Sequence, residues 1–134
     1  MVTTPLKNGS GGVVILTTSD VSSVLSSLDP ELALESQRNA FAALSTQFAT
    51  SSHDIPTVQC PQRTTLKSET MTSLFMPSRV ADAGGMACKI VSIPTNGGEG
   101  GLPATTVIMD EKTGRIKAIV NARRLTALRN ACGT

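Results

Sequence analysis

Lys89 is the residue whose type and position most clearly predict a functional role. It lies in the apolar segment Met86–Ile93, and the alternation of a strand puts its side chain on the same face as Ala87, Val91 and Ile93. A lysine on an apolar strand face needs a charged partner or a cavity, because an unpaired buried ammonium group is costly. The alternative is a lysine at a sheet edge whose ammonium group reaches solvent along the surface.

Arg129 is a second candidate, in the last helical segment. It lies four residues after Leu125 and three before Cys132, on the apolar stripe, whereas Arg123 and Arg124 fall elsewhere. An arginine directed at a core usually meets a carboxylate, because the guanidinium group matches two oxygens. The carboxylate can belong to a ligand or to an Asp or Glu of the chain, and position alone favours neither.

Other polar positions predict less. Arg63 follows Cys60-Pro-Gln and, by position alone, is a surface residue after a turn. His53 lies in a polar loop without partners for a catalytic triad or a zinc site. The glycine-rich segment 96–101 lacks the spacing and the strand-to-helix context of a dinucleotide fingerprint, and we expect a mobile loop there.

Composition excludes several classes of function. The chain has 134 residues, a net charge of +2, 40% hydrophobic and 16% charged residues, which fits one folded domain. No apolar run approaches the roughly 20 residues of a membrane span, and no signal pattern is present, so we expect a cytoplasmic protein. The three cysteines are widely spaced, and we expect free thiols and no metal site. The weak charge and scarce aromatic residues argue against nucleic-acid binding.

The first half of the chain carries helix signals. We expect a disordered N-terminus over residues 1–12, a strand at Val13–Leu16, and a short helix with Val21, Val24, Leu25 and Leu28 on one face. Thr18 or Ser19 can cap that helix, with Asp20 in its first turn. The sequence Asp29-Pro30-Glu31 starts a second helix, which runs to about Phe48 with Leu34, Phe41, Leu44 and Phe48 facing inward.

The second half carries strand signals and so completes an α+β fold. After a loop from Ala49 to Pro61, a mostly antiparallel sheet is expected, followed by a helix from about Ala122. A hairpin turn at Asp110–Gly114 joins the last two strands. The predicted strands are Arg63–Leu66, Thr72–Met76, Met86–Ile93, Thr105–Met109 and Arg115–Val120.

Several short segments, taken in order, resemble the ornithine cyclodeaminase/mu-crystallin family. The similarity covers nearly the whole chain from about residue 13. The segments are Val14-Ile-Leu-Thr-x-x-Asp20-Val, Pro61-x-Arg63-Thr, Leu74-Phe-Met-Pro-Ser78, Lys89-Ile-Val with Asn96, Gly101-Leu-Pro103, Asp110-x-x-x-Gly114 and Leu125-Thr-Ala-Leu-Arg129.

The resemblance implies a role for each candidate residue. Residues 13–134 would form a substrate-binding and dimerisation domain, a half-barrel that pairs across a homodimer and is truncated before the family's Rossmann NAD(P) domain. Arg63, Lys89 and Arg129 match the cations that bind the substrate carboxylate, and Met76 matches a pocket-wall position. Ala104 stands where the family usually has a hydroxyl residue, for which Thr105 could substitute.

The activity implied is that of an NAD(P)-dependent enzyme acting on small amino acids. The family converts ornithine to proline plus ammonia or carries out related imine reductions, and the choice of substrate and of NAD or NADP stays open. The nucleotide domain and its catalytic aspartate are not in this sequence, so no catalytic residue and no bound cofactor are expected for the chain alone. The alternative is an inactive binding and dimerisation module or a gene remnant.

Overall fold

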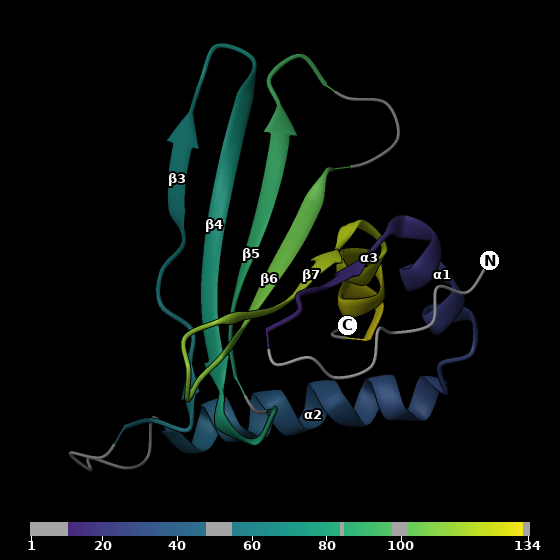
Figure 1. Cartoon of the computed structure of the whole chain (residues 1–134), viewed down its shortest axis with the longest axis vertical. Coiled ribbons are helices and arrows are strands. Elements are labelled where there is room, and N and C mark those ends of the chain that lie inside the picture. Colours follow the sequence, from purple (N-terminus) through teal and green to yellow (C-terminus); the bar gives the residue numbers. More distant parts are fainter. Residues whose placement is uncertain (1–10, 48–54, 84, 98–101, 133–134) are drawn as a thin grey trace.

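A seven-stranded sheet and three α-helices make up the part of the chain that the structure describes (Figure 1). The structure is a computed structural model, and it describes residues 11–47, 55–83, 85–97 and 102–132. The expected α+β class is confirmed. The elements are β1 (Val14–Leu16), α1 (Thr18–Ser26), α2 (Pro30–Gln47), β2 (Val58–Gln59), β3 (Thr64–Lys67), β4 (Met71–Val80), β5 (Gly85–Pro94), β6 (Ala104–Asp110), β7 (Ile116–Asn121) and α3 (Arg123–Cys132).

The sheet is antiparallel except at one edge. Its order is β1-β7-β6-β5-β4-β2, with β3 also paired to β4, and β1 joins β7 in parallel. All six predicted strands are present with slightly different bounds. The largest extension is in β4, which continues through Pro77 because β3 pairs with β4 only up to Phe75 and β2 begins at Arg79, so no neighbour on that side needs the missing N–H. The loop expected from Ala49 to Pro61 is wrong at β2, a two-residue strand too short to produce a pattern.

Local hydrogen bonds explain where α1 and α2 begin. Thr17 caps α1: its hydroxyl accepts from the backbone N–H of Asp20 (3.4 Å), and the Asp20 carboxylate accepts from the backbone N–H of Thr17 (2.9 Å). Thr18 and Ser19, the predicted caps, already lie inside the helix. At α2, the Asp29 carboxylate accepts from the backbone N–H of Glu31 (3.0 Å), as the sequence predicts.

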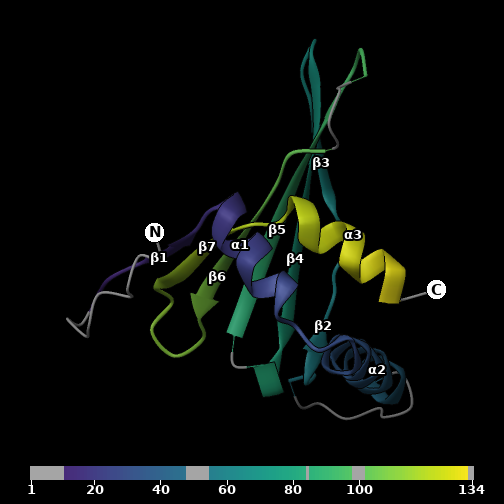
Figure 2. The same cartoon turned by 90° about the vertical axis from the view of Figure 1, so that its right-hand side faces the viewer.

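The inward face predicted for α2 is only partly right. Leu34 and Leu44 are half-buried, but Phe41 is 53% exposed. The helix crosses near one end of the strands, where it contacts β2 and α3, so most of its length has no sheet to pack against (Figures 1 and 2). Phe48, like most of the segment 1–12, lies outside the described residues.

The hairpin between β6 and β7 is confirmed. The Asp110 carboxylate accepts from the backbone N–H groups of Lys112 (3.0 Å) and Thr113 (2.8 Å). Gly114 closes the turn with φ +68°, a conformation that side chains disfavour, and its N–H donates to the Asp110 carbonyl (2.8 Å). These bonds hold the pKa of Asp110 below its usual value, with the Thr113 N–H as the largest cause.

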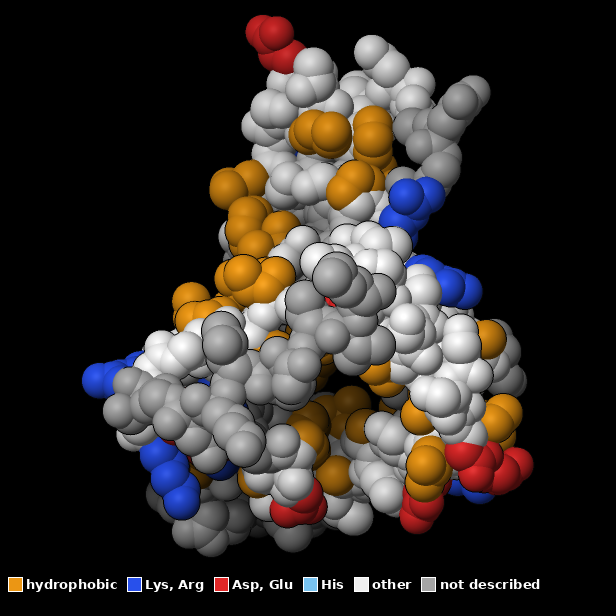
Figure 3. Space-filling model, turned by 45° about the vertical axis from the view of Figure 1, so that its right-hand side comes forward, with side chains coloured by type: hydrophobic (Ala, Val, Ile, Leu, Met, Phe, Trp, Pro, Cys, Tyr) orange, Lys and Arg blue, Asp and Glu red, His pale blue; other side chains and the backbone are white. Residues whose placement is uncertain are grey.

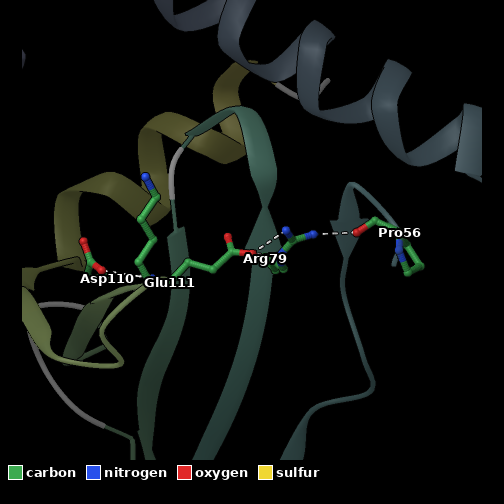
Figure 4. Close-up of polar contacts among 5 residues, drawn as sticks. Pro56, Arg79, Asp110 and Glu111 are labelled. Atoms are coloured by element: carbon green, nitrogen blue, oxygen red, sulfur yellow. Dashed lines mark hydrogen bonds and ion pairs between the residues drawn. The ribbon is translucent and has the colours of Figure 1, made fainter. Parts of the chain in front are cut away.

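Polar contacts of Arg79 link three segments of the chain at this end of the sheet (Figure 4). Arg79 on β4 donates through Nε to Glu111 Oε1 (2.8 Å) in the β6–β7 turn, and a second guanidinium nitrogen forms an ion pair with the same carboxylate. Its remaining nitrogen donates to the carbonyl of Pro56 (2.7 Å), just before β2. The side chain of Arg79 is only 16% exposed, so the contact fixes the short β2 edge against the centre of the sheet.

The two faces of the sheet differ. Figures 1 and 2 show α1 and α3 against one side of it, and there the buried residues Val91, Ala104 and Ala122 form a small core joined by Met76 and Leu125. No helix of the described ranges covers the other side. This uncovered face has an apolar row across five strands, made of Pro77, Cys88, Val107, Ile119 and Ile15.

Candidate functional site

A row of paired residues on the helix-covered face places Lys89. Lys89 of β5 pairs with Met76 of β4 and Thr106 of β6, and Thr106 pairs with Val120 of β7. Residues directly opposite each other in antiparallel strands point to the same face, so these four side chains lie side by side. Lys89 is therefore central in the sheet, which excludes the sheet-edge alternative.

A pocket of about 350 Å³ lies between this face, α2 and α3. Lys89 and Thr106 form its floor, and Arg129 reaches it from α3. Figure 3 shows a hollow among hydrophobic side chains in the lower half of the molecule. The other lining residues are Leu28, Leu32, Ala33, Ser36, Gln37, Ala122, Leu125, Thr126, Leu128 and Cys132.

Lys89 and Arg129 are the only charged residues among those described that line the pocket. Neither pairs with an Asp or Glu of the described ranges; Arg129 donates instead to the side-chain oxygen of its neighbour Asn130 (3.0 Å). The expectation that Arg129 is directed at a core is wrong, because Arg129 is exposed, and the structure shows no buried ion pair between it and an acid of the described residues.

The surroundings of Lys89 disfavour its charged form. Burial lowers the pKa of Lys89 below its usual value, and the positive charge of Arg129 lowers it further. A bound anion would relieve both effects, because it would replace lost hydration and offset the repulsion between like charges. The arrangement suits an anion-binding site.

The other two predicted site residues lie outside the pocket lining. Met76 packs against the core and lies beside Lys89 on the same face of the sheet. Arg63 is exposed and immediately precedes β3, two strands away from Lys89. The structure therefore brings Lys89 and Arg129 together but not Arg63, whose role in carboxylate binding stays a prediction.

Thr106 is the pocket residue that the sequence reasoning missed. Thr105, expected as a possible substitute for the hydroxyl absent at Ala104, points to the opposite face, since it pairs with Ile90 and Asn121. Strand alternation from Ala104 was the available signal, because it puts residue 106 and not residue 105 on the same face.

The connection between β1 and α1 does not fit a dinucleotide phosphate. The β1–α1 connection has no glycine, and the position that a phosphate would need at the start of α1 is taken by the carboxylate of Asp20.

All three cysteines are free thiols. No helix in the described ranges has the length and apolar character needed to cross a membrane.

Comparisons with known proteins identify solved structures that have a similar fold. No protein-family model matches the sequence, and no curated protein matches it either. Several solved structures match 90% of the chain. They include an archaeal alanine dehydrogenase dimer with bound NAD (21% identity, TM-score 0.73, 34% of that chain), the Thermococcus litoralis Δ1-pyrroline-2-carboxylate reductase with NADH and L-proline (25%, 0.73, 35%), and a probable ornithine cyclodeaminase from Bordetella pertussis Tohama I (14%, 0.69, 34%).

The chain thus spans about a third of the length of these structures. Neighbours described with a ligand bind NAD or NADH, and one also holds L-proline. The expected resemblance is confirmed at the level of the fold: this chain has the fold of one part of the ornithine cyclodeaminase, alanine dehydrogenase and pyrroline-2-carboxylate reductase structures.

Proposed function

We propose that this chain is the carboxylate-binding and dimerisation part of an NAD(P)-dependent enzyme that acts on small amino or imino acids. The observation that carries the proposal is the pair Lys89 and Arg129 in one pocket without an acidic partner among the described lining residues. The fold neighbours include a reductase in complex with L-proline and a lysine cyclodeaminase that recognises L-lysine and L-ornithine, all of which carry a carboxylate.

The proposed role of these side chains is binding and orientation. The Lys89 ammonium group and the Arg129 guanidinium group hold the carboxylate with charged hydrogen bonds, and the Thr106 hydroxyl lies on the same floor. Holding the carboxylate fixes the neighbouring α-carbon, and such positioning lowers the entropic cost of a reaction there. Hydride transfer itself requires a nicotinamide cofactor, which would bind in the remaining part of the proposed enzyme.

We further propose that two copies of the chain associate through the uncovered face. Val107 and Ile119 lie at the centre of its apolar row, and Ile15 at the edge strand is 65% exposed. A continuous apolar row on a sheet is unfavourable in water and marks an interaction surface. A second copy is the occupant we favour, because the archaeal alanine dehydrogenase with this fold is a dimer.

Substitution of Arg129 tests the carboxylate site. Arg129→Ala is expected to weaken binding of carboxylates such as L-proline by about 1.5–3 kcal/mol, the usual value of hydrogen bonds to charged groups. Arg124→Ala is the matched control, since Arg124 lies on the same helix, is exposed and does not line the pocket. NMR titration of the three proteins gives the affinities, and equal affinities would refute the proposed function.

A further inference from the structure

The wall that α2 contributes to the pocket changes its chemistry along the helix. It is made of two residues from one turn and two from the next: Leu32, Ala33, Ser36 and Gln37. Their spacing places all four on one face of α2. The first pair is apolar and the second pair is polar. A ligand that lies along this wall therefore meets apolar side chains first and hydrogen-bonding groups one turn, about 5.4 Å, further along.

The amide of Gln37 is available to a ligand. The side chain is half-buried in the pocket wall, and within the described ranges neither its oxygen nor its nitrogen forms a hydrogen bond. Thr126, another polar residue of the lining, already donates its hydroxyl hydrogen to the Ala122 carbonyl (3.0 Å) and can only accept. An amide has an oxygen acceptor and two N–H donors, so Gln37 can pair with a group that donates, accepts or does both.

The pocket thus offers two kinds of polar group from different elements. The charged pair, Lys89 and Arg129, comes from β5 and α3, whereas Gln37 is neutral and comes from α2. Leu125 and Leu128 of α3 line the same pocket and suit a short carbon chain. A ligand with a carboxylate at one end and a neutral hydrogen-bonding group at the other would use all of these side chains.

We propose that Gln37 determines specificity, and that it selects amino acids whose side chain ends in a hydroxyl or a carboxamide over those whose side chain ends in a methyl group. This inference rests on the proposed carboxylate site and adds the recognition of the ligand's side chain. A terminal hydroxyl replaces the hydrogen bonds of the amide to water, whereas a methyl group displaces that water and leaves the amide unpaired. The α-amino group is common to both kinds of ligand and does not affect the comparison.

L-homoserine and L-norvaline test this selection, because they have the same charge and differ only by a terminal hydroxyl in place of a methyl group. NMR titration of the whole chain is expected to show about fivefold tighter binding of homoserine, the effect of one neutral hydrogen bond. In Gln37→Leu, which keeps the size of the side chain and removes its polar atoms, the two affinities are expected to become equal. Asn39→Leu is the matched control, because Asn39 is exposed on the same helix and does not line the pocket.

The outcomes separate this inference from the proposed function. Equal affinities of the parent chain for the two ligands, or an unchanged preference in Gln37→Leu, would overturn the inference. If binding of both ligands still weakens in Arg129→Ala, the proposed carboxylate site stands without it. Failure of both ligands to bind would overturn both proposals.

A charged residue at the same position provides the second test. L-2,4-diaminobutyrate has the skeleton of homoserine with an ammonium group in place of the hydroxyl, and Gln37→Glu puts a carboxylate of the same shape on the wall. The ratio of its affinity to that of norvaline is expected to rise about tenfold in this variant, because charged hydrogen bonds are the stronger ones. Phe41→Glu is the control, since Phe41 lies on the same helix outside the lining. The same ratio in both variants would show that residue 37 does not reach the ligand's side chain, and would contradict the inference.

Discussion

At the scale of single residues, the important feature is a lysine whose surroundings oppose its charge. Lys89 lies at the centre of the sheet, beside the pocket and facing the charge of Arg129. Both burial and the arginine lower its pKa, burial being the larger cause. A carboxylate binds more tightly to the protonated form of Lys89 than to the neutral form. The titration of Lys89 and the binding of a carboxylate are therefore linked.

This linkage predicts a pH dependence. Affinity for 2-oxopentanoate, which has no ammonium group to titrate, is expected to fall as the pH rises through the lowered pKa of Lys89, because the ammonium group then becomes neutral. In Lys89→Arg the affinity is expected to stay constant up to about pH 10.5, since a guanidinium group keeps its charge there. Calorimetric titrations from pH 7 upward measure both, and a parallel fall in the two proteins would show that another group is responsible.

The sequence singles out Lys89 and Arg129 more clearly than the other residues of the pocket. Lys89 and Arg129 each stand out against an apolar face of their own element, so local periodicity is enough to find them. Thr106 carries no such contrast, and Arg63 has only its similarity to the family motif to single it out. Which residues share a pocket depends on the packing of α3 and α2 over the sheet, a long-range arrangement that periodicity does not encode.

At the scale of helices and strands, local sequence patterns again predict more than they can say about long-range packing. The strands and the Asp110–Gly114 turn follow from alternation and turn chemistry, and they are confirmed. The exposure of Phe41 was not predicted, because a helical pattern reports an apolar stripe and not how much of it meets a partner. The cap at Thr17 was missed by one residue, the usual precision of a helix boundary.

The contact of Arg79 should measurably stabilise the end of the sheet. Arg79→Met removes the ion pair with Glu111 and the hydrogen bond to the Pro56 carbonyl, and we expect a loss of about 1–2 kcal/mol in the free energy of unfolding, given the partial exposure of Glu111. Arg115→Met is the control, because Arg115 is exposed and forms no ion pair within the described ranges. Urea unfolding compares them, and equal losses would contradict the assigned role.

At the scale of the whole molecule, the sheet is covered on one face only. Its described core is small: six hydrophobic residues are buried, while Ile15, Leu66 and Ile116 remain exposed on strands. A small core on one side and an apolar row on the other are the features expected of a subunit that completes its packing by association. In the sequence, association of two copies is suggested only by the family resemblance.

Association through the uncovered face can be tested by adding charge. Val107→Glu places a carboxylate at the middle of the apolar row, and it is expected to convert a dimer into a monomer because the buried charge would have no partner. Phe41→Glu adds the same charge on α2, away from this face, and should leave the dimer intact. Light scattering after size exclusion gives the masses, and a monomeric parent protein or a dimeric Val107→Glu variant would count against the proposal.

The position of a bound ligand tests the central claim most directly. A crystal structure of the chain with 2-oxopentanoate should place the carboxylate within about 3.2 Å of both the Lys89 ammonium nitrogen and a guanidinium nitrogen of Arg129, the range of charged hydrogen bonds. That result would establish the pocket as a carboxylate site built by the sheet and α3. A ligand bound elsewhere, or held in the pocket without contact to either cation, would contradict it.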